Sequence, residues 1–160
     1  MAIYDYLPTF HVVEPNNLKG LQPGFVVAQM EVKAGCSLLK GDLFENGHIC
    51  SIGADGIDIW AAGKPMFIHF TEPLNTIVNS DKYFAVNTKE ECPRLVELIP
   101  GDEWMTDIDY ETATEYAGIK EELMKHIVKL TKANGQSKDD WYGIDTLADG
   151  TKAFHYMYIG

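Results

Sequence analysis

DLFENGHICSIGADGIDIW, residues 42–60, is the stretch that decides the fold class of this chain. It alternates short apolar and β-branched runs with glycine-containing turns. Asn46-Gly47 tolerates the positive φ that a type I′ turn requires at both central positions, so it predicts a two-residue hairpin joining the residues on either side of it. Gly53–Gly56 predicts a second turn, and residues 57–60 alternate apolar and polar as a half-buried strand does. We therefore expect consecutive antiparallel strands here.

The β pattern continues on both sides of this stretch. Apolar and β-branched runs bounded by turn residues, including a turn at residues 63–65, occupy residues 25–32, 66–70, 83–86 and 94–99. Short strands separated by such turns are typical of antiparallel sandwiches and small barrels. The sequence therefore predicts one β-rich globular domain over residues 24–160.

Residues 112–133 have a different period. Apolar residues recur there at spacings of three and four, which places them on one helical face. Thr112 and Glu115 fit a capping box, and glutamates precede lysines along the segment, as the helix macrodipole favours. The predicted fold class is therefore α+β, mainly an antiparallel β sandwich or small barrel with one amphipathic helix near residues 112–133. Turn residues between two apolar runs predict a C-terminal hairpin over residues 141–159.

Residues 1–23 precede the predicted domain and have the character of an arm. Prolines recur through the segment, which disfavours a regular helix or a central strand. Its aromatic and aliphatic side chains must nevertheless be covered, either by the protein's own domain or by a neighbouring subunit. The candidate partner-contact residues are Ile3, Tyr4, Tyr6, Leu7 and Phe10.

Composition excludes several classes of function. The 160 residues carry a formal net charge of −11, which repels phosphate backbones and argues against nucleic-acid binding. No run of apolar residues is long enough for a membrane span, and the N-terminus lacks the features of a signal peptide, so we expect no membrane partner and a cytoplasmic site of synthesis. Cys36, Cys50 and Cys92 fit neither a disulfide framework nor a zinc motif, and Cys50 is expected to be a small buried hydrophobe.

A search for catalytic chemistry gives no catalytic, cofactor-binding or metal-binding residue. His69 lies in a strand pattern and is expected to face away from its apolar neighbours or to form one hydrogen bond, because catalysis would need a nearby nucleophile. Asp107, Asp109 and Glu111 alternate, but they lack the spacing of a calcium-binding loop and are expected to form a solvated loop. The sequence therefore predicts a protein that is not an enzyme and needs no cofactor.

Two short motifs in the central stretch, LKGDL at residues 39–43 and NGHI at residues 46–49, stand out together with DTLADGT at residues 145–151. Their cadence resembles that of small capsid-associated proteins of tailed bacteriophages, including the decoration, or cement, proteins that bind the assembled head. The resemblance covers residues 24–100 and 141–160 and leaves the predicted helix outside it. It implies a virion structural protein that decorates or stabilises a capsid, forms a homo-oligomer, and has the major capsid protein or other virion subunits as partners.

That resemblance also implies localisation in the virion, and in the host cytoplasm during assembly. Two alternatives remain open from the residues themselves. One is an inhibitor whose acidic surface binds a basic host protein. The other is a small-molecule-binding or hydrolytic β domain that uses His69 or the acidic loop.

Overall fold

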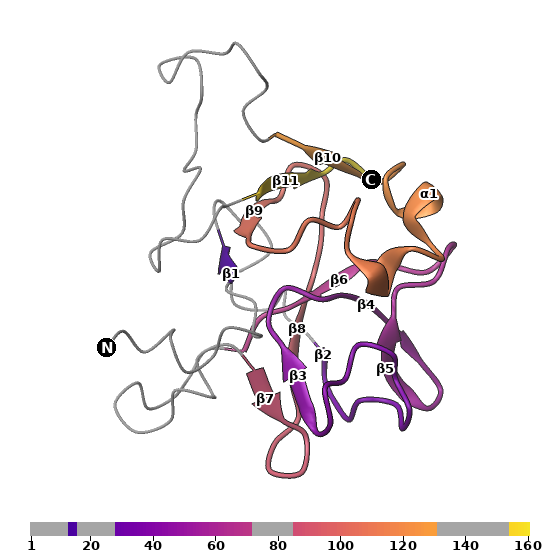
Figure 1. Cartoon of the computed structure of the whole chain (residues 1–160), viewed down its shortest axis with the longest axis vertical. Coiled ribbons are helices and arrows are strands. Elements are labelled where there is room, and N and C mark those ends of the chain that lie inside the picture. The colour runs from indigo at the N-terminus through magenta and orange to yellow at the C-terminus, as the bar shows by residue number, and fades with distance from the viewer. Residues whose placement is uncertain (1–12, 16–27, 72–84, 131–153) are drawn as a thin grey trace.

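The computed structural model describes residues 13–15, 28–71, 85–130 and 154–160 (Figure 1). These residues are mostly antiparallel β-structure with very little helix, which confirms the β-rich part of the predicted fold class. The strands are β1 (Val13–Pro15), β2 (Ala28–Gln29), β3 (Leu43–Glu45), β4 (Ile49–Gly53), β5 (Gly56–Ile59), β6 (Phe67–His69), β7 (Ala85–Asn87), β8 (Arg94–Glu97), β9 (Glu103–Thr106), β10 (Ile127–Lys129) and β11 (Phe154–Tyr158). The helical elements of this part of the chain are a 3-10 turn, Thr114–Tyr116, and α1 (Lys120–Leu123).

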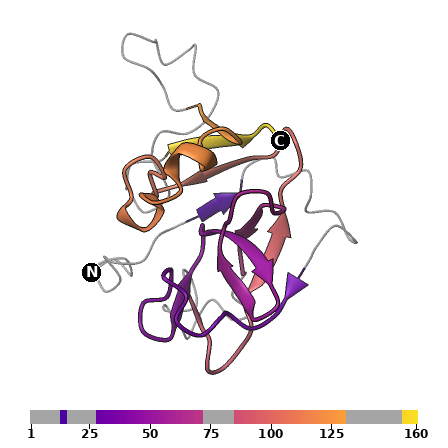
Figure 2. The same ribbon diagram turned by 90° about the vertical axis from the view of Figure 1, so that its right-hand side faces the viewer.

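Within the described residues the strands form two main sheets and one small one. The five-stranded sheet has the order β2-β8-β6-β4-β5, the four-stranded sheet has the order β1-β9-β11-β10, and β3 pairs with β7. Figure 1 shows β9, β10 and β11 in the upper part of the molecule and β3, β5 and β7 in the lower part, and Figure 2 shows the same two levels after a quarter turn. No helix in the described ranges is long and apolar enough to cross a membrane.

The predicted Asn46-Gly47 hairpin is wrong. Gly47 does have a positive φ of 94°, but β3 pairs with β7, while β4 pairs with β5 and β6. The Asn46 side-chain amide donates to the Thr71 carbonyl and accepts the Thr71 N–H. The Gly47 N–H donates to the His69 carbonyl at 2.8 Å. These contacts with distant residues outweigh the local preference for a hairpin turn. Residues 45–49 therefore cross from the small sheet to the five-stranded sheet. We call residues 45–49 the crossing segment.

The second predicted turn is confirmed. Strands β4 and β5 are joined at residues 53–56 with Gly53 opposite Gly56. Gly56 has a φ of 117°, and a Cβ atom there would lie 2.4 Å from the Glu31 carbonyl oxygen. That close approach exists because the Ile57 N–H donates to the same carbonyl at 2.9 Å, so only glycine fits the position.

The single amphipathic helix predicted near residues 112–133 is not confirmed. Among the described residues of that range, only the 3-10 turn and α1 are helical, and Ile127–Lys129 form β10. The expected Thr112 cap is missing because Ala113 occupies the N-cap and makes no side-chain cap bond. Ile127 and Val128 are β-branched, and pairing with β11 gives them hydrogen bonds and neighbours that a helix would not.

At the C-terminus the second strand of the predicted hairpin exists as β11, while its first strand lies outside the described residues. Strand β11 pairs with β9 and β10 instead. Strand β9 was not predicted from the sequence, because its first and last residues, Glu103 and Thr106, are polar. All four of its residues are nevertheless buried. The part of the predicted arm that is described, β1, pairs with β9 at one edge of the four-stranded sheet.

A layer of aromatic rings fills the space between the two main sheets. The ring centroids of Trp104 and Tyr156 lie 5.9 Å apart in a stacked pair. Tyr110 lies 4.8 Å from Tyr156 and meets Tyr116 edge-on at 5.2 Å. All four side chains are fully buried, so this layer packs the four-stranded sheet against the crossing segment.

Candidate functional site

His69, which in catalysis would need a nearby nucleophile, lies in the core at 0% exposure. Its Nδ1 donates to the Glu45 carbonyl at 2.6 Å, and its Nε2 lies 2.8 Å from the Thr71 hydroxyl. That hydroxyl oxygen accepts the Arg94 N–H at 2.9 Å, which leaves its proton for Nε2. Burial lowers the pKa of His69 to about 4, partly opposed by the bond to the Glu45 carbonyl. His69 therefore stays neutral and forms two bonds rather than the one expected.

His48 lies on the crossing segment itself and is 3% exposed. Its Nδ1 lies 3.1 Å from the Tyr116 hydroxyl, which also accepts the Ile49 N–H at 3.0 Å. One residue away, the Gly47 carbonyl accepts the Tyr110 hydroxyl proton at 2.5 Å. Burial raises the pKa of both tyrosines, which keeps these hydroxyls protonated. Both histidines therefore join the crossing segment to its surroundings.

Cys50 follows the crossing segment in β4 and is 0% exposed, which confirms it as a small buried hydrophobe. Burial raises the pKa of its thiol well above the ordinary value, which disfavours the thiolate that a nucleophile requires. Cys36 is also buried, and burial raises its pKa in the same way. Neither thiol has the electropositive, accessible surroundings of a reactive cysteine.

The acidic run after β9 is fixed in place rather than solvated throughout. Asp109 lies 2.8 Å from the Lys129 ammonium and accepts the Tyr156 hydroxyl proton at 3.0 Å. Burial acts to raise the pKa of Asp109, but the bonds from Lys129 and Tyr156 outweigh it and lower the pKa overall. Across the ranges that the structure describes, no three His, Cys, Asp or Glu residues gather in a way that could hold a metal ion. Asp109 thus ties the loop to β10 and β11.

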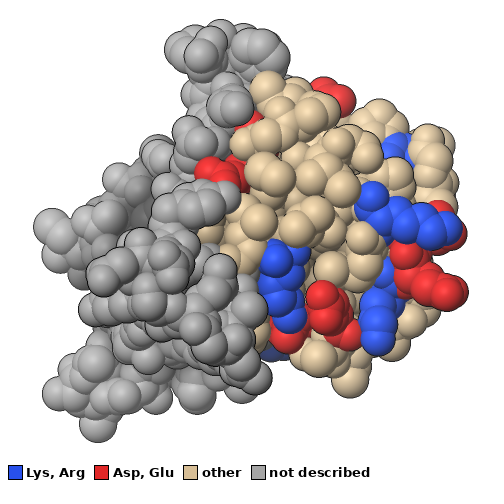
Figure 3. All heavy atoms as spheres, turned by 90° about the horizontal axis from the view of Figure 1, so that it is seen from above, with Lys and Arg blue, Asp and Glu red and all other residues tan. Residues whose placement is uncertain are grey.

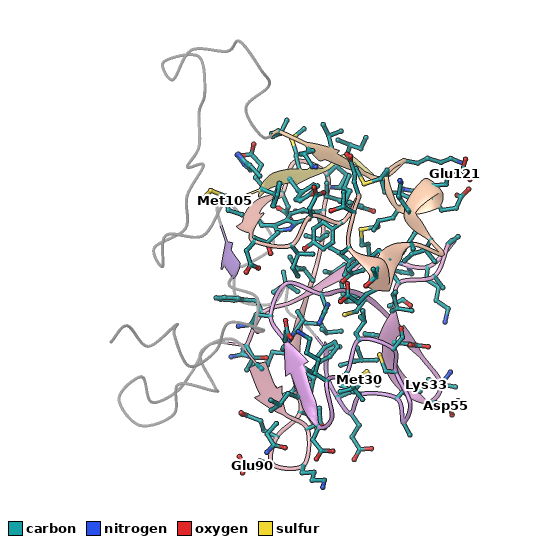
Figure 4. The ribbon with its side chains drawn as sticks, viewed as in Figure 1. Met30, Lys33, Asp55, Glu90, Met105 and Glu121 are labelled. Carbon is teal, nitrogen blue, oxygen red and sulfur yellow. The ribbon has the colours of Figure 1, made fainter. Side chains whose placement is uncertain are left out.

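A small hollow of about 190 Å³ lies beside the β4–β5 turn. Figure 4 shows Lys33 and Asp55, which both line it, at the same end of the molecule. Asp58 and Lys64 also line it, and the Lys33 ammonium lies 3.5 Å from the Asp58 carboxylate. The charges in this hollow balance one another, so it has no clear preference for a ligand of one sign.

The candidate contact residues of the arm, Ile3, Tyr4, Tyr6, Leu7 and Phe10, lie outside the described residues. The structure does place the next part of the chain. Val13 lies opposite Thr106 and Pro15 opposite Trp104, so the backbone that follows the arm is fixed against β9. A proline is tolerated there because β1 is an edge strand.

Charged side chains are mixed on the face shown in Figure 3. Acidic and basic groups alternate along one border of the described surface, and the centre of that surface carries neither. The net charge of −11 is therefore not gathered into one acidic patch on this face.

Compared with known proteins, the chain matches no family model, no curated protein and no solved structure.

Proposed function

We propose that this chain is a non-enzymatic virion structural protein, which decorates or stabilises a phage capsid through contacts with the major capsid protein or other virion subunits. The observation that carries the proposal is the anchoring of β1 on β9. A partner held by the aromatic arm would be held at a defined edge of a rigid sheet, because β1 begins three residues after Phe10. The proposed site of action is the virion, reached by assembly in the host cytoplasm.

The buried polar groups support a contact role over the hydrolytic alternative. The imidazole of His69 is enclosed between Glu45 and Thr71, and the carboxylate of Asp109 is bound by Lys129 and Tyr156. Each of these groups stabilises the body, which is what a decoration protein needs from its interior. The charges on the face shown in Figure 3 are mixed, so that face is not the acidic surface that the inhibitor alternative needs.

The test is cosedimentation of the purified chain with empty heads of the phage that encodes it. The truncation ends before β1: deleting residues 2–11 removes the candidate contact residues and leaves β1 in place. We expect this truncation to lose binding while its thermal unfolding remains that of the full chain. The matched control is Val128→Ser on β10, the opposite edge of the same sheet, where the side chain is 36% exposed. Val128→Ser should bind normally.

Either of two results would reject the proposal. The first is a full chain that stays in the supernatant when heads are in excess. The second is a truncated chain that binds as tightly as the full chain, which would place the contact on the body.

A further inference from the structure

The hollow of about 190 Å³ beside the β4–β5 turn has two cations and two anions in its walls. The four charged side chains are those of Lys33, Asp55, Asp58 and Lys64. Their formal charges add to zero, in a chain whose net charge is −11. A ligand with a single charge would be attracted by two of these groups and repelled by the other two, whereas a ligand with both charges can be attracted at each end.

Backbone hydrogen bonds hold the segments that carry these charges. The Lys33 N–H donates to the Ile57 carbonyl at 2.8 Å, which fixes the first lysine along β5. The Lys64 N–H donates to the Ala61 carbonyl at 3.2 Å, which fixes the second in its turn. Both aspartates belong to the β4–β5 hairpin. The backbone that carries the four charges is therefore in place before a ligand arrives, which lowers the cost of binding.

One cation and one anion of the hollow already meet each other. The Lys33 ammonium lies 3.5 Å from the Asp58 carboxylate. Lys64 and Asp55 are exposed, and among the described residues neither has a group of opposite charge within 4 Å. The Lys64 ammonium nevertheless lies at the turn that carries Asp55, 3.5 Å from the point where a Cβ atom of Gly53 would stand. The hollow therefore presents a cation and an anion at one turn without joining them.

We infer that this hollow is a binding site for a small zwitterion of the amino-acid class, whose carboxylate meets Lys64 while its ammonium group meets Asp55. Each end of such a ligand forms a charge-assisted hydrogen bond with a group of opposite charge. The volume of about 190 Å³ is below the roughly 300–1,000 Å³ of pockets for drug-sized ligands, which limits the ligand to a few heavy atoms. The inference is independent of the arm and of any virion partner.

The probes are glycine, acetate and methylammonium, each titrated into the full chain at pH 7 and constant ionic strength. Binding is followed by the backbone ¹⁵N–¹H resonances of Gly53 and Gly56, which both line the hollow. Acetate carries only the negative end of glycine, and methylammonium carries only the positive end. We expect saturable shifts with a dissociation constant of roughly 10 mM for glycine. Acetate and methylammonium should each bind about three- to fivefold more weakly, because each lacks one partly exposed ion pair.

Lys64→Gln should weaken the binding of glycine and acetate about three- to fivefold and should not weaken that of methylammonium. Asp55→Asn should weaken the binding of glycine and methylammonium by a similar factor and should not weaken that of acetate. The matched control is Lys89→Gln, at an exposed lysine after β7 that lies 3.1 Å from Asp42, and it should leave all three affinities unchanged. Thermal unfolding of each variant shows that it is folded.

Three outcomes would overturn the inference. The first is no saturable shift at Gly53 or Gly56 with glycine. The second is an affinity for acetate or methylammonium equal to that for glycine, which would mean that only one end of the ligand is recognised. The third is glycine binding that either Lys64→Gln or Asp55→Asn leaves unchanged, or that Lys89→Gln weakens as much as they do.

Discussion

Tyr110→Phe tests whether the crossing segment is held by buried hydrogen bonds. The Tyr110 hydroxyl donates to the Gly47 carbonyl at 2.5 Å and accepts the indole N–H of Trp104 at 3.2 Å. Phenylalanine keeps the ring and its packing on Tyr116 and Tyr156 but removes the oxygen. A buried carbonyl and a buried N–H then lose a partner at once.

The magnitude follows from that pair of groups. Leaving one buried polar group without its bond costs about 1–3 kcal/mol, so two such groups predict a loss of about 3 kcal/mol in the free energy of unfolding. For a chain of this size that loss corresponds to a fall of about 6–12 °C in Tm. Urea unfolding followed by tryptophan fluorescence measures the free energy, and an unchanged m-value would show that the same amount of surface unfolds.

The matched control is Tyr158→Phe. Tyr158 is half-buried, and among the described residues its hydroxyl forms no hydrogen bond, so its loss should change the free energy of unfolding by less than about 0.5 kcal/mol. A Tyr110→Phe protein as stable as Tyr158→Phe would refute the reasoning, because it would show that the Gly47 carbonyl and the Trp104 N–H need no bond from this hydroxyl.

Two further predictions concern His69 and Gly56. The pKa of His69 is near 4 in the folded chain and near 6.5 unfolded, so the unfolded state gains the proton first and stability falls as pH drops from 6.5 to 4. The loss from this group amounts to about 3 kcal/mol and is complete below pH 4, and burial lowers the pKa of His155 in the same direction. Urea unfolding from pH 7 to pH 4 should therefore show a shallower decline for His69→Gln, and parallel declines would contradict the assignment. Gly56→Ala adds a Cβ 2.4 Å from the Glu31 carbonyl oxygen at a φ of 117° and should cost about 2–4 kcal/mol. Gly35→Ala, at a φ of 79° but in open space, should cost only about 1 kcal/mol in the same assay, and equal losses would mean that the contact with Glu31 relaxes freely.

Local signals predicted the parts of the fold that are local. The turn at residues 53–56 and the strand that follows it depend on neighbouring residues, and both exist where the pattern placed them. The predicted helix is not confirmed, because residues 127–129 pair with β11 and form a strand. Strand β11 lies far along the chain from them, so no window of sequence around residues 112–133 could contain that information.

The surroundings of the candidate site residues were likewise predictable only where they depend on nearby residues. Sequence alone left His69 either facing away from its apolar neighbours or forming one hydrogen bond. One of its two partners, Thr71, lies two residues away, but the other, the Glu45 carbonyl, comes from a distant segment. The rings of Trp60 and His126 lie 5.2 Å apart because the two sheets meet, and nothing in the sequence around either residue indicates the other.

The crossing segment links these observations. Its Glu45 side chain is 0% exposed and lies 2.6 Å from the Lys40 ammonium, while Asn46, Gly47 and His48 bond to other segments. Well-packed apolar residues of similar volume often stabilise a core as well as buried charged groups do, so the burial of Glu45 is weak evidence that it is there for stability. Directional bonds instead allow one register only, because a shifted segment would leave several buried groups without partners.

That register has a consequence for the surface. Through Tyr110 and Tyr116, the crossing segment fixes how the four-stranded sheet sits on the five-stranded sheet. Trp60 after β5 meets His126 before β10 where the two sheets meet, and β1 is anchored on β9 of the four-stranded sheet. If the buried bonds set that geometry, Tyr110→Phe should shift the ¹⁵N–¹H resonance of the Trp60 indole, because the His126 ring that stands edge-on to it precedes β10 of the other sheet. An unchanged resonance would show that the contact between the two sheets does not depend on the Tyr110 hydroxyl.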